Sequence, residues 1–154
     1  MKLWFCRSRS VAGFLIRLVT FCRWNHVAIE VDGMVYEASL PGGVQRLSAE
    51  GFANRWADAV AVDVPVTNKQ ALLWFLEQQV GKPYDLGALL TFPLGRNWQH
   101  PHKWFCAELA AKALTVAGLP AFFIAQHKVW PRDLWAIAPW MQKTSGMPES
   151  GVYS

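Results

Sequence analysis

The feature that most constrains the fold is an Asp-Gly pair between two strand-forming runs. Within residues 24–39, the runs WNHVAIEV and MVYEAS are separated by Asp32 and Gly33. An Asp-Gly pair in this position is the strongest short-range signal of a β-hairpin. The sequence therefore predicts two antiparallel strands with a tight turn, in which Val31 pairs with Met34.

This register also predicts which side chains share a face of the hairpin. Ala28 is expected opposite Glu37, so His26 and Glu37 become diagonal neighbours on one face, with Cα atoms about 7–8 Å apart. A glutamate covers that gap and can hydrogen-bond the imidazole, which fixes its tautomer and stabilises its charged form. Ser39, directly opposite His26, is the rival orienting group. Glu30 lies too far along the same strand to contact His26. Alternatively, Glu30 and Glu37 could simply be solvated on an exposed face of the hairpin.

Other segments carry the patterns of further strands and helices. Thr67 and Gln70 form a capping box at the start of one predicted helix, and Gly118 is expected to end another. Apolar residues at helical spacing predict that each helix packs on a core. The predicted strands cover 2–6, 44–47 and 60–64; a helical turn is expected within 48–57, and helices from Ser8 or Ser10 to Cys22, from Thr67 to Val80, from Asp85 to Leu90 and from Phe105 to Ala117.

Length and composition indicate one globular domain. The chain has 154 residues, of which 53% are hydrophobic and 17% charged, and this excludes a wholly disordered chain. We expect a single domain over residues 1–141 and a polar tail over 142–154. The net charge is only +4 and the basic residues are dispersed, so a nucleic-acid partner is not expected.

The N-terminal region predicts neither a signal peptide nor a membrane-spanning helix. The longest apolar run, residues 11–22, is interrupted by Arg17 and falls well short of the roughly 20 residues that span a bilayer. Contact of this helix with a membrane surface is an alternative to packing on the core. We expect cytoplasmic synthesis; a cell-wall enzyme would then need delivery without a signal, by a phage particle, a lysis pathway or a secretion system.

One of the three cysteines lies where a nucleophile would. Cys106 falls in the first turn of a predicted helix, where unpaired N–H groups and the helix dipole favour a thiolate and can hold an oxyanion. Cysteine is equally common as a small buried residue, so position alone leaves both interpretations open. Cys6 and Cys22 are expected to be structural.

A thiol nucleophile needs a base, and His26 is the histidine that a predicted strand would hold rigidly. A lone histidine in a strand is more often structural, but the hairpin face shared with Glu37 favours a catalytic role. His100, His102 and Cys106, together with His26, could be considered as metal ligands. Their spacing is not typical of a zinc site, so we expect neither a metal nor a cofactor.

Several short motifs occur in an order that resembles one enzyme family. They are WNHVAI at 24–29, YEA at 36–38, GKPYD at 81–85, FCAEL at 105–109 and WPRDL at 130–134. Together they resemble the circularly permuted NlpC/P60 (YiiX/YaeF-like) group of papain-like cysteine hydrolases, in which the histidine strand precedes the cysteine helix. The Gly-Asp that often precedes the first strand in that family is missing here.

The resemblance implies a fold and a set of site residues. The fold would be α+β and permuted papain-like, with a small antiparallel sheet or half-barrel against helices and the catalytic cysteine at a helix N-terminus. Cys106 matches the nucleophile, His26 the base and Glu37 the third member of the triad. Tyr84 matches a tyrosine that lines the site in this family, and Trp24 is also expected at the substrate. Apart from the resemblance, His102 and Lys103 are expected there because their loop should border the cleft and offer donors to an anionic substrate.

The predicted activity is cleavage of an amide bond through a thioester. A cell-wall peptide or a related peptide-like molecule is the leading substrate class. A lipid or acyl-ester hydrolase, or an acyltransferase of the same superfamily, is the second hypothesis. The third is a non-catalytic binding module that retains the fold. The sequence does not indicate an oligomeric state.

Overall fold

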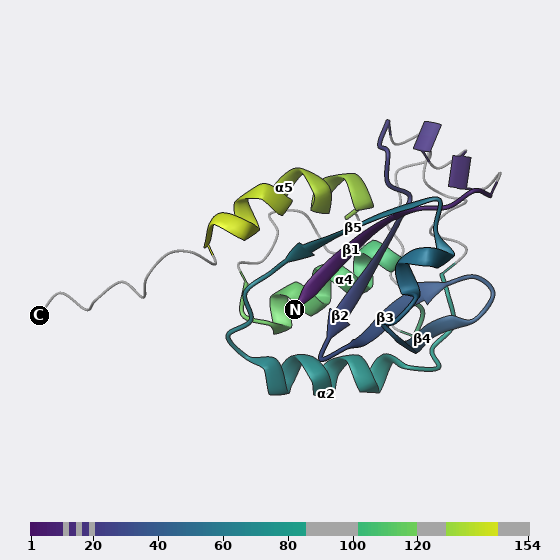
Figure 1. The fold of residues 1–154 in the computed structure, drawn as a ribbon. Helices are drawn as coiled ribbons and strands as arrows, with labels where there is room; N and C mark the ends of the chain where they lie inside the picture. The colour runs from purple at the N-terminus through teal and green to yellow at the C-terminus, as the bar shows by residue number, and fades with distance from the viewer. Residues whose placement is uncertain (11–12, 15–16, 19–20, 86–101, 120–128, 145–154) are drawn as a thin grey trace, which may run out of the picture.

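Five antiparallel strands form the sheet on which the rest of the domain is built (Figure 1). The computed structural model describes residues 1–10, 13–14, 17–18, 21–85, 102–119 and 129–144. The architecture is α+β, and the strand order in the sheet is β4-β3-β2-β1-β5. The strands are β1 (Lys2–Arg7), β2 (His26–Val31), β3 (Met34–Ser39), β4 (Gly43–Ser48) and β5 (Asp58–Asp63).

The predicted hairpin is confirmed as β2 and β3. Val31 pairs with Met34, and Ile29 pairs with Tyr36. Asp32 and Gly33 both have positive φ, at 51° and 74°, as a tight turn of this kind requires. Because side chains alternate along a strand, this register places the even-numbered residues of β2 on one face of the sheet and the odd-numbered ones on the other.

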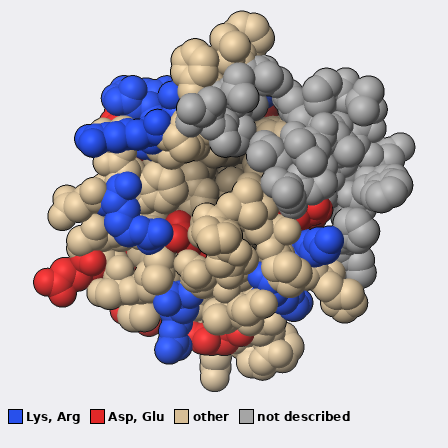
Figure 2. Space-filling model, turned by 90° about the vertical axis from the view of Figure 1, so that its right-hand side faces the viewer, with Lys and Arg blue, Asp and Glu red and all other residues tan. Residues whose placement is uncertain are grey.

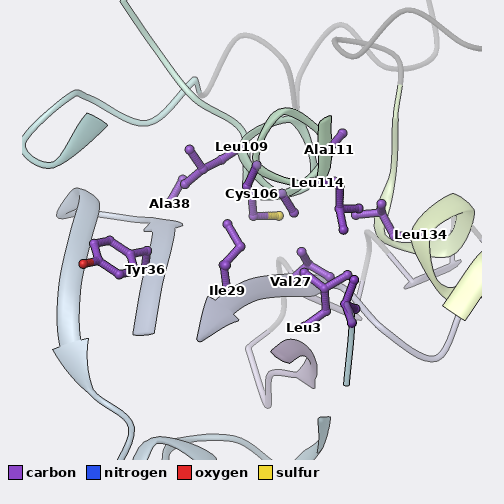
Figure 3. Close-up of a cluster of buried hydrophobic side chains, with 14 of the residues drawn as sticks. Leu3, Val27, Ile29, Tyr36, Ala38, Cys106, Leu109, Ala111, Leu114 and Leu134 are labelled. Carbon is purple, nitrogen blue, oxygen red and sulfur yellow. The ribbon is translucent and has the colours of Figure 1, made fainter. Parts of the chain in front are cut away.

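Helices cover the odd-numbered face of β2. α4 (Cys106–Val116) packs on β2 and β3, α2 (Lys69–Gln79) packs on α4, and α5 (Pro131–Thr144) packs on α4 and β5 (Figure 1). The main core lies between α4 and the sheet, where small alanines of the helix allow close approach. Figure 3 shows this layer, which includes Leu3, Val27, Ile29, Tyr36, Ala38, Cys106, Leu109 and Leu114.

A smaller cluster lies on the opposite face of the sheet. Its buried members are Cys6, Ala28, Val35 and Phe52, and Phe52 comes from the 3-10 helix η1 (Phe52–Arg55). This short helix confirms the helical turn expected within residues 48–57. η1 packs on the face of the sheet that carries the even-numbered residues of β2. The chain between β4 and β5 therefore passes over His26.

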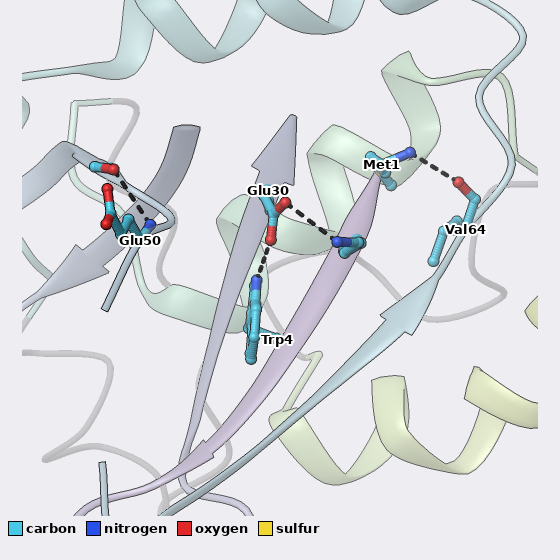
Figure 4. A network of polar contacts seen from close by, with 7 residues as sticks. Met1, Trp4, Glu30, Glu50 and Val64 are labelled. Carbon is cyan, nitrogen blue, oxygen red and sulfur yellow. Dashed lines mark hydrogen bonds and ion pairs between the residues drawn. The ribbon is translucent and has the colours of Figure 1, made fainter. Parts of the chain in front are cut away.

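Polar contacts at the start of β1 fix the middle of the sheet (Figure 4). The Met1 ammonium donates to the Val64 carbonyl at 3.0 Å, and Trp4 Nε1 donates to Glu30 Oε2 at 2.7 Å. Lys2 Nζ lies 3.4 Å from Glu30 Oε1. Glu30 therefore belongs to this network between β1 and β2, which agrees with the prediction that it is too distant to contact His26.

The start of α2 differs from the prediction. Asn68, not Thr67, is the N-cap residue, and its side chain accepts a hydrogen bond from the Ala71 N–H at 3.0 Å. Thr67 is engaged elsewhere, because its Oγ1 donates to the Ala117 carbonyl at 2.9 Å. Contact with the end of α4 thus overrides the capping box. Val80, the last residue of the predicted helix, is exposed rather than packed on the core.

The predicted N-terminal helix is only partly tested. Residues 13–14 and 17–18 are helical, and the Gly13 N–H donates to Ser10 Oγ at 3.0 Å. The prediction that Phe14 and Leu18 pack on the core is wrong, because both are exposed. Arg17 instead turns toward the body of the protein, where its guanidinium donates to the Ser8 carbonyl.

Two further predictions concern the ends of elements. α5 continues through Thr144 and so runs past the domain boundary expected after residue 141. Most of the predicted helix over 85–90, together with His100 and the tail from residue 145, lies outside the described residues. Within the described part of the chain, the helices are too short or too polar to cross a membrane.

Candidate active site

His26 is the first residue of β2 and forms a buried pair with Glu37 of β3. The two atoms His26 Nε2 and Glu37 Oε2 are 2.9 Å apart, and the Glu37 side chain is 0% exposed. A carboxylate only accepts hydrogen bonds, so Nε2 carries the proton and donates it. Of the two orienting groups left open by the sequence, Glu37 is the one that contacts the ring. The other nitrogen, Nδ1, is left for a second partner.

Two residues that follow β4 complete the surroundings of this pair. Arg55 Nη1 lies 3.1 Å from Glu37 Oε1. One oxygen of the carboxylate therefore faces a guanidinium, and the other faces an imidazole that can become charged. The Trp56 ring stacks on the His26 ring with centroids 4.7 Å apart and an interplanar angle of 19°. The indole covers one face of the imidazole and restricts both its rotation and its contact with water.

Cys106 is the first residue of α4. Phe105 is the N-cap, in extended conformation, and the Leu109 N–H donates to its carbonyl at 3.0 Å. The backbone N–H groups of the first turn lie before the first hydrogen bond within the helix, so they have no carbonyl of the helix to bind. They give the N-terminus of α4 a partial positive charge. The side chain points from α4 toward the sheet and is 2% exposed (Figure 3). This placement confirms the predicted position of Cys106 at a helix N-terminus.

Although α4 covers the other face of β2, the Cys106 thiol is near enough to the His26 imidazole to change its proton affinity. Burial lowers the pKa of His26, but hydrogen bonds and charges of Cys106 and Glu37 outweigh it and raise that pKa to about 9. Since Nε2 is held by Glu37, Nδ1 is the nitrogen left to exchange a proton with the sulfur. The arrangement is therefore a chain of three groups, from thiol to imidazole to carboxylate, with the ring favoured in its charged form.

Electrostatics also hold Glu37 in its charged form. Burial raises the pKa of this carboxyl, but the hydrogen bond and charge of His26, followed by those of Arg55, bring the pKa below its ordinary value. Cys6 lies on the neighbouring strand, opposite His26. Burial raises the pKa of its thiol, and the charges of Glu37 and Cys106 raise it further, so Cys6 stays protonated.

Tyr84 lies near Cys106, and its predicted role in lining the substrate site stays a prediction. It forms an isolated parallel bridge with Trp104, and its ring centroid is 6.0 Å from that of Phe105. Burial raises the pKa of Tyr84, and the charge of the nearby Cys106 adds to this effect. The bridge ties the segment before residue 86 to the residues that lead into α4.

The other residues expected at the substrate fall in two groups. Trp24 is a core residue, because its ring is buried and makes an edge contact with Trp135 at 5.4 Å between centroids. The expectation that it contacts substrate is therefore corrected. His102 and Lys103 are exposed in the segment just before α4. Figure 2 looks onto the end of the molecule where β2 begins, and its surface is hollowed there, with Lys and Arg side chains on several sides.

Neither Arg55 nor Trp56 was found from the sequence. Both lie between two predicted strands, where the sequence indicates only a helical turn. Periodicity does not show which residue of a strand such a turn will cover. Cys6, Cys22 and Cys106 are all free thiols. Within the residues that the structure describes, no cluster of three or more His, Cys, Asp or Glu side chains could hold a metal ion.

Comparison with protein-family models and with curated proteins gives no match to this chain. What the chain does must therefore be inferred from the chemistry of this site.

Proposed function

We propose that the chain is a cysteine hydrolase that cleaves an amide bond through a thioester. The observation that carries the proposal is the buried His26–Glu37 hydrogen bond together with Cys106 at the N-terminus of α4, near enough to raise the pKa of His26. A thiol beside an oriented imidazole, with helix N–H groups close by, contains the parts that acyl transfer requires. The same parts, in the same chain order, support membership of the permuted NlpC/P60, papain-like group.

The geometry assigns a role to each group. His26 Nδ1 takes the proton of the Cys106 thiol, or already holds it in a thiolate–imidazolium pair, and the thiolate attacks the carbonyl carbon of the substrate. Backbone N–H groups at the start of α4 stabilise the resulting oxyanion. Nδ1 then returns its proton to the leaving nitrogen, which departs and leaves a thioester. Water loses a proton to Nδ1 and attacks the thioester; the C–S bond then breaks, the carboxylic acid product departs, and the Cys106 thiolate takes the proton back from Nδ1.

A cell-wall peptide is the leading substrate class, and a lipid ester is the second candidate. One observation favours the lipid: Phe14, Leu18 and Phe21 are 55%, 57% and 92% exposed, and they precede the strand that begins with His26. Exposed apolar side chains of this kind insert readily into a lipid surface. A binding module without catalysis is the third candidate, and it requires no activated thiol.

Selective alkylation tests whether the thiol is activated. At pH 6, iodoacetamide should modify Cys106 at least about tenfold faster than Cys22, because an ordinary thiol is then less than about 1% ionised. Cys6 should react slowest, since it is fully buried and its pKa is raised. Peptide mass mapping over time measures the three rates. Equal, slow modification of all three would favour the binding module.

A substrate screen then tests the reaction itself. Purified peptidoglycan incubated with the chain should release new amino groups, and a chain first alkylated at Cys106 should release none. Mixed phospholipid vesicles form the second arm, in which released fatty acid would assign the lipid ester instead. If alkylation is selective but neither substrate is cleaved, the amide and lipid assignments fail while the activated thiol stands.

A further inference from the structure

The carboxylate of Glu37 has a second charged partner that the proposed reaction does not use. Arg55 reaches it from η1, with Nη1 3.1 Å from Oε1, while Oε2 binds His26. The Glu37 side chain is 0% exposed and that of Arg55 is 49% exposed. The guanidinium thus bridges solvent and a buried anion, and it also lies over the Phe52 ring at 5.6 Å, which restrains it.

The need for this partner follows from the proposed reaction. When His26 is charged, it stabilises Glu37 directly. After Nδ1 gives its proton to the leaving group, the ring is neutral and only its Nε2–H dipole faces the carboxylate. An isolated buried carboxylate would then tend to take up a proton, because burial disfavours the charged form. A protonated Glu37 could no longer stabilise the next imidazolium.

We propose that Arg55 is a positioning residue, which keeps Glu37 ionised and its Oε2 directed at His26 while the ring is neutral. The inference rests on the proposed function. Among the described residues, the ionisable groups that interact with Glu37 are His26 of β2, Arg55 of η1 and Cys6 of β1, while Cys106 of α4 interacts with His26. Arg55 is the permanent cation among them. Cys6 remains neutral, so its thiol does not replace the guanidinium.

Alkylation of Cys106 as a function of pH tests this role without any substrate. Removing a fixed positive charge raises the proton affinity of the whole cluster, so thiolate should form at higher pH. In Arg55→Ala, the rate with iodoacetamide at pH 6 should fall roughly tenfold below that of the native chain, and the whole profile should move toward higher pH. Arg55→Lys, which retains the charge, should recover most of the rate.

Arg46→Ala is the matched control. Arg46 is 50% exposed and pairs with Glu77, 2.8 Å away, rather than with Glu37. Its removal should leave the profile in place. If Arg55→Ala fails to fold, Arg55→Gln replaces it, because the amide keeps a donor without the charge and should show the same displacement.

A profile for Arg55→Ala or Arg55→Gln that superimposes on the native one overturns the proposal. A displacement equal to that of Arg46→Ala does the same, because it would reflect only the loss of net charge. Failure of the proposed function is seen separately: the native chain would then show no rapid alkylation at pH 6, or no turnover in the substrate screen.

Discussion

Replacing Cys106 by alanine is expected to lower the rate of hydrolysis by about 10⁴-fold or more, because the variant cannot form the thioester. Alanine is small and apolar, as the surrounding core is, so the domain should still fold. With a substrate from the screen, the measurement is the initial rate, together with the intact mass of the protein during turnover. The native chain should carry an acyl adduct, and the variant should carry none.

Cys22→Ala is the control for this variant. Cys22 is only partly buried and lies in the stretch that precedes Trp24, so its loss should leave both the rate and the adduct unchanged. Residual activity in Cys106→Ala within tenfold of the native rate would show that another group performs the chemistry.

Replacing Glu37 by glutamine is expected to cost about 10³- to 10⁴-fold in turnover, although the change is nearly isosteric. From the sequence alone, an amide at this position could still orient the ring. Arg55 changes that expectation, because its N–H requires an acceptor and so holds the amide oxygen. The amide NH₂ then faces His26 Nε2, which must become an acceptor. The ring proton moves to Nδ1, where it blocks transfer from the thiol.

The double variant Glu37→Gln with Arg55→Ala separates this cause from a general loss of structure. Without the guanidinium, the amide can turn its oxygen toward Nε2, so the double variant should be more active than Glu37→Gln alone. Initial rates of the two proteins, measured with the same substrate, give the comparison. A double variant no more active than the single one would contradict the tautomer argument.

The core of the site could be predicted because it depends on local periodicity. The Asp-Gly turn sets the pairing of β2 with β3, and side-chain alternation then brings His26 and Glu37 to one face. The helix that begins at Cys106 has a regular pattern that ends at Gly118. Each of these signals lies within one element or one tight turn, so no knowledge of the wider fold is needed.

The remaining parts of the site depend on contacts between distant segments. Arg55 and Trp56 reach the triad only because η1 folds back over the sheet, and no repeat in the sequence encodes that path. Thr67 loses its capping role to a hydrogen bond with Ala117. Trp24 belongs to a motif beside the histidine, but its contact with Trp135 on α5 makes it a core residue.

The two reactive side chains are both the first residues of their elements. His26 opens β2 and Cys106 opens α4, so each follows directly on a connecting segment. Regular backbone follows each residue, and a buried neighbour, Trp24 or Phe105, holds the backbone before it. Both reactive groups are therefore anchored from two sides, and the choice of substrate can change at exposed positions farther away without moving them. An engineer seeking new specificity should begin with exposed residues such as His102 and Lys103 and leave Trp24 and Phe105 untouched.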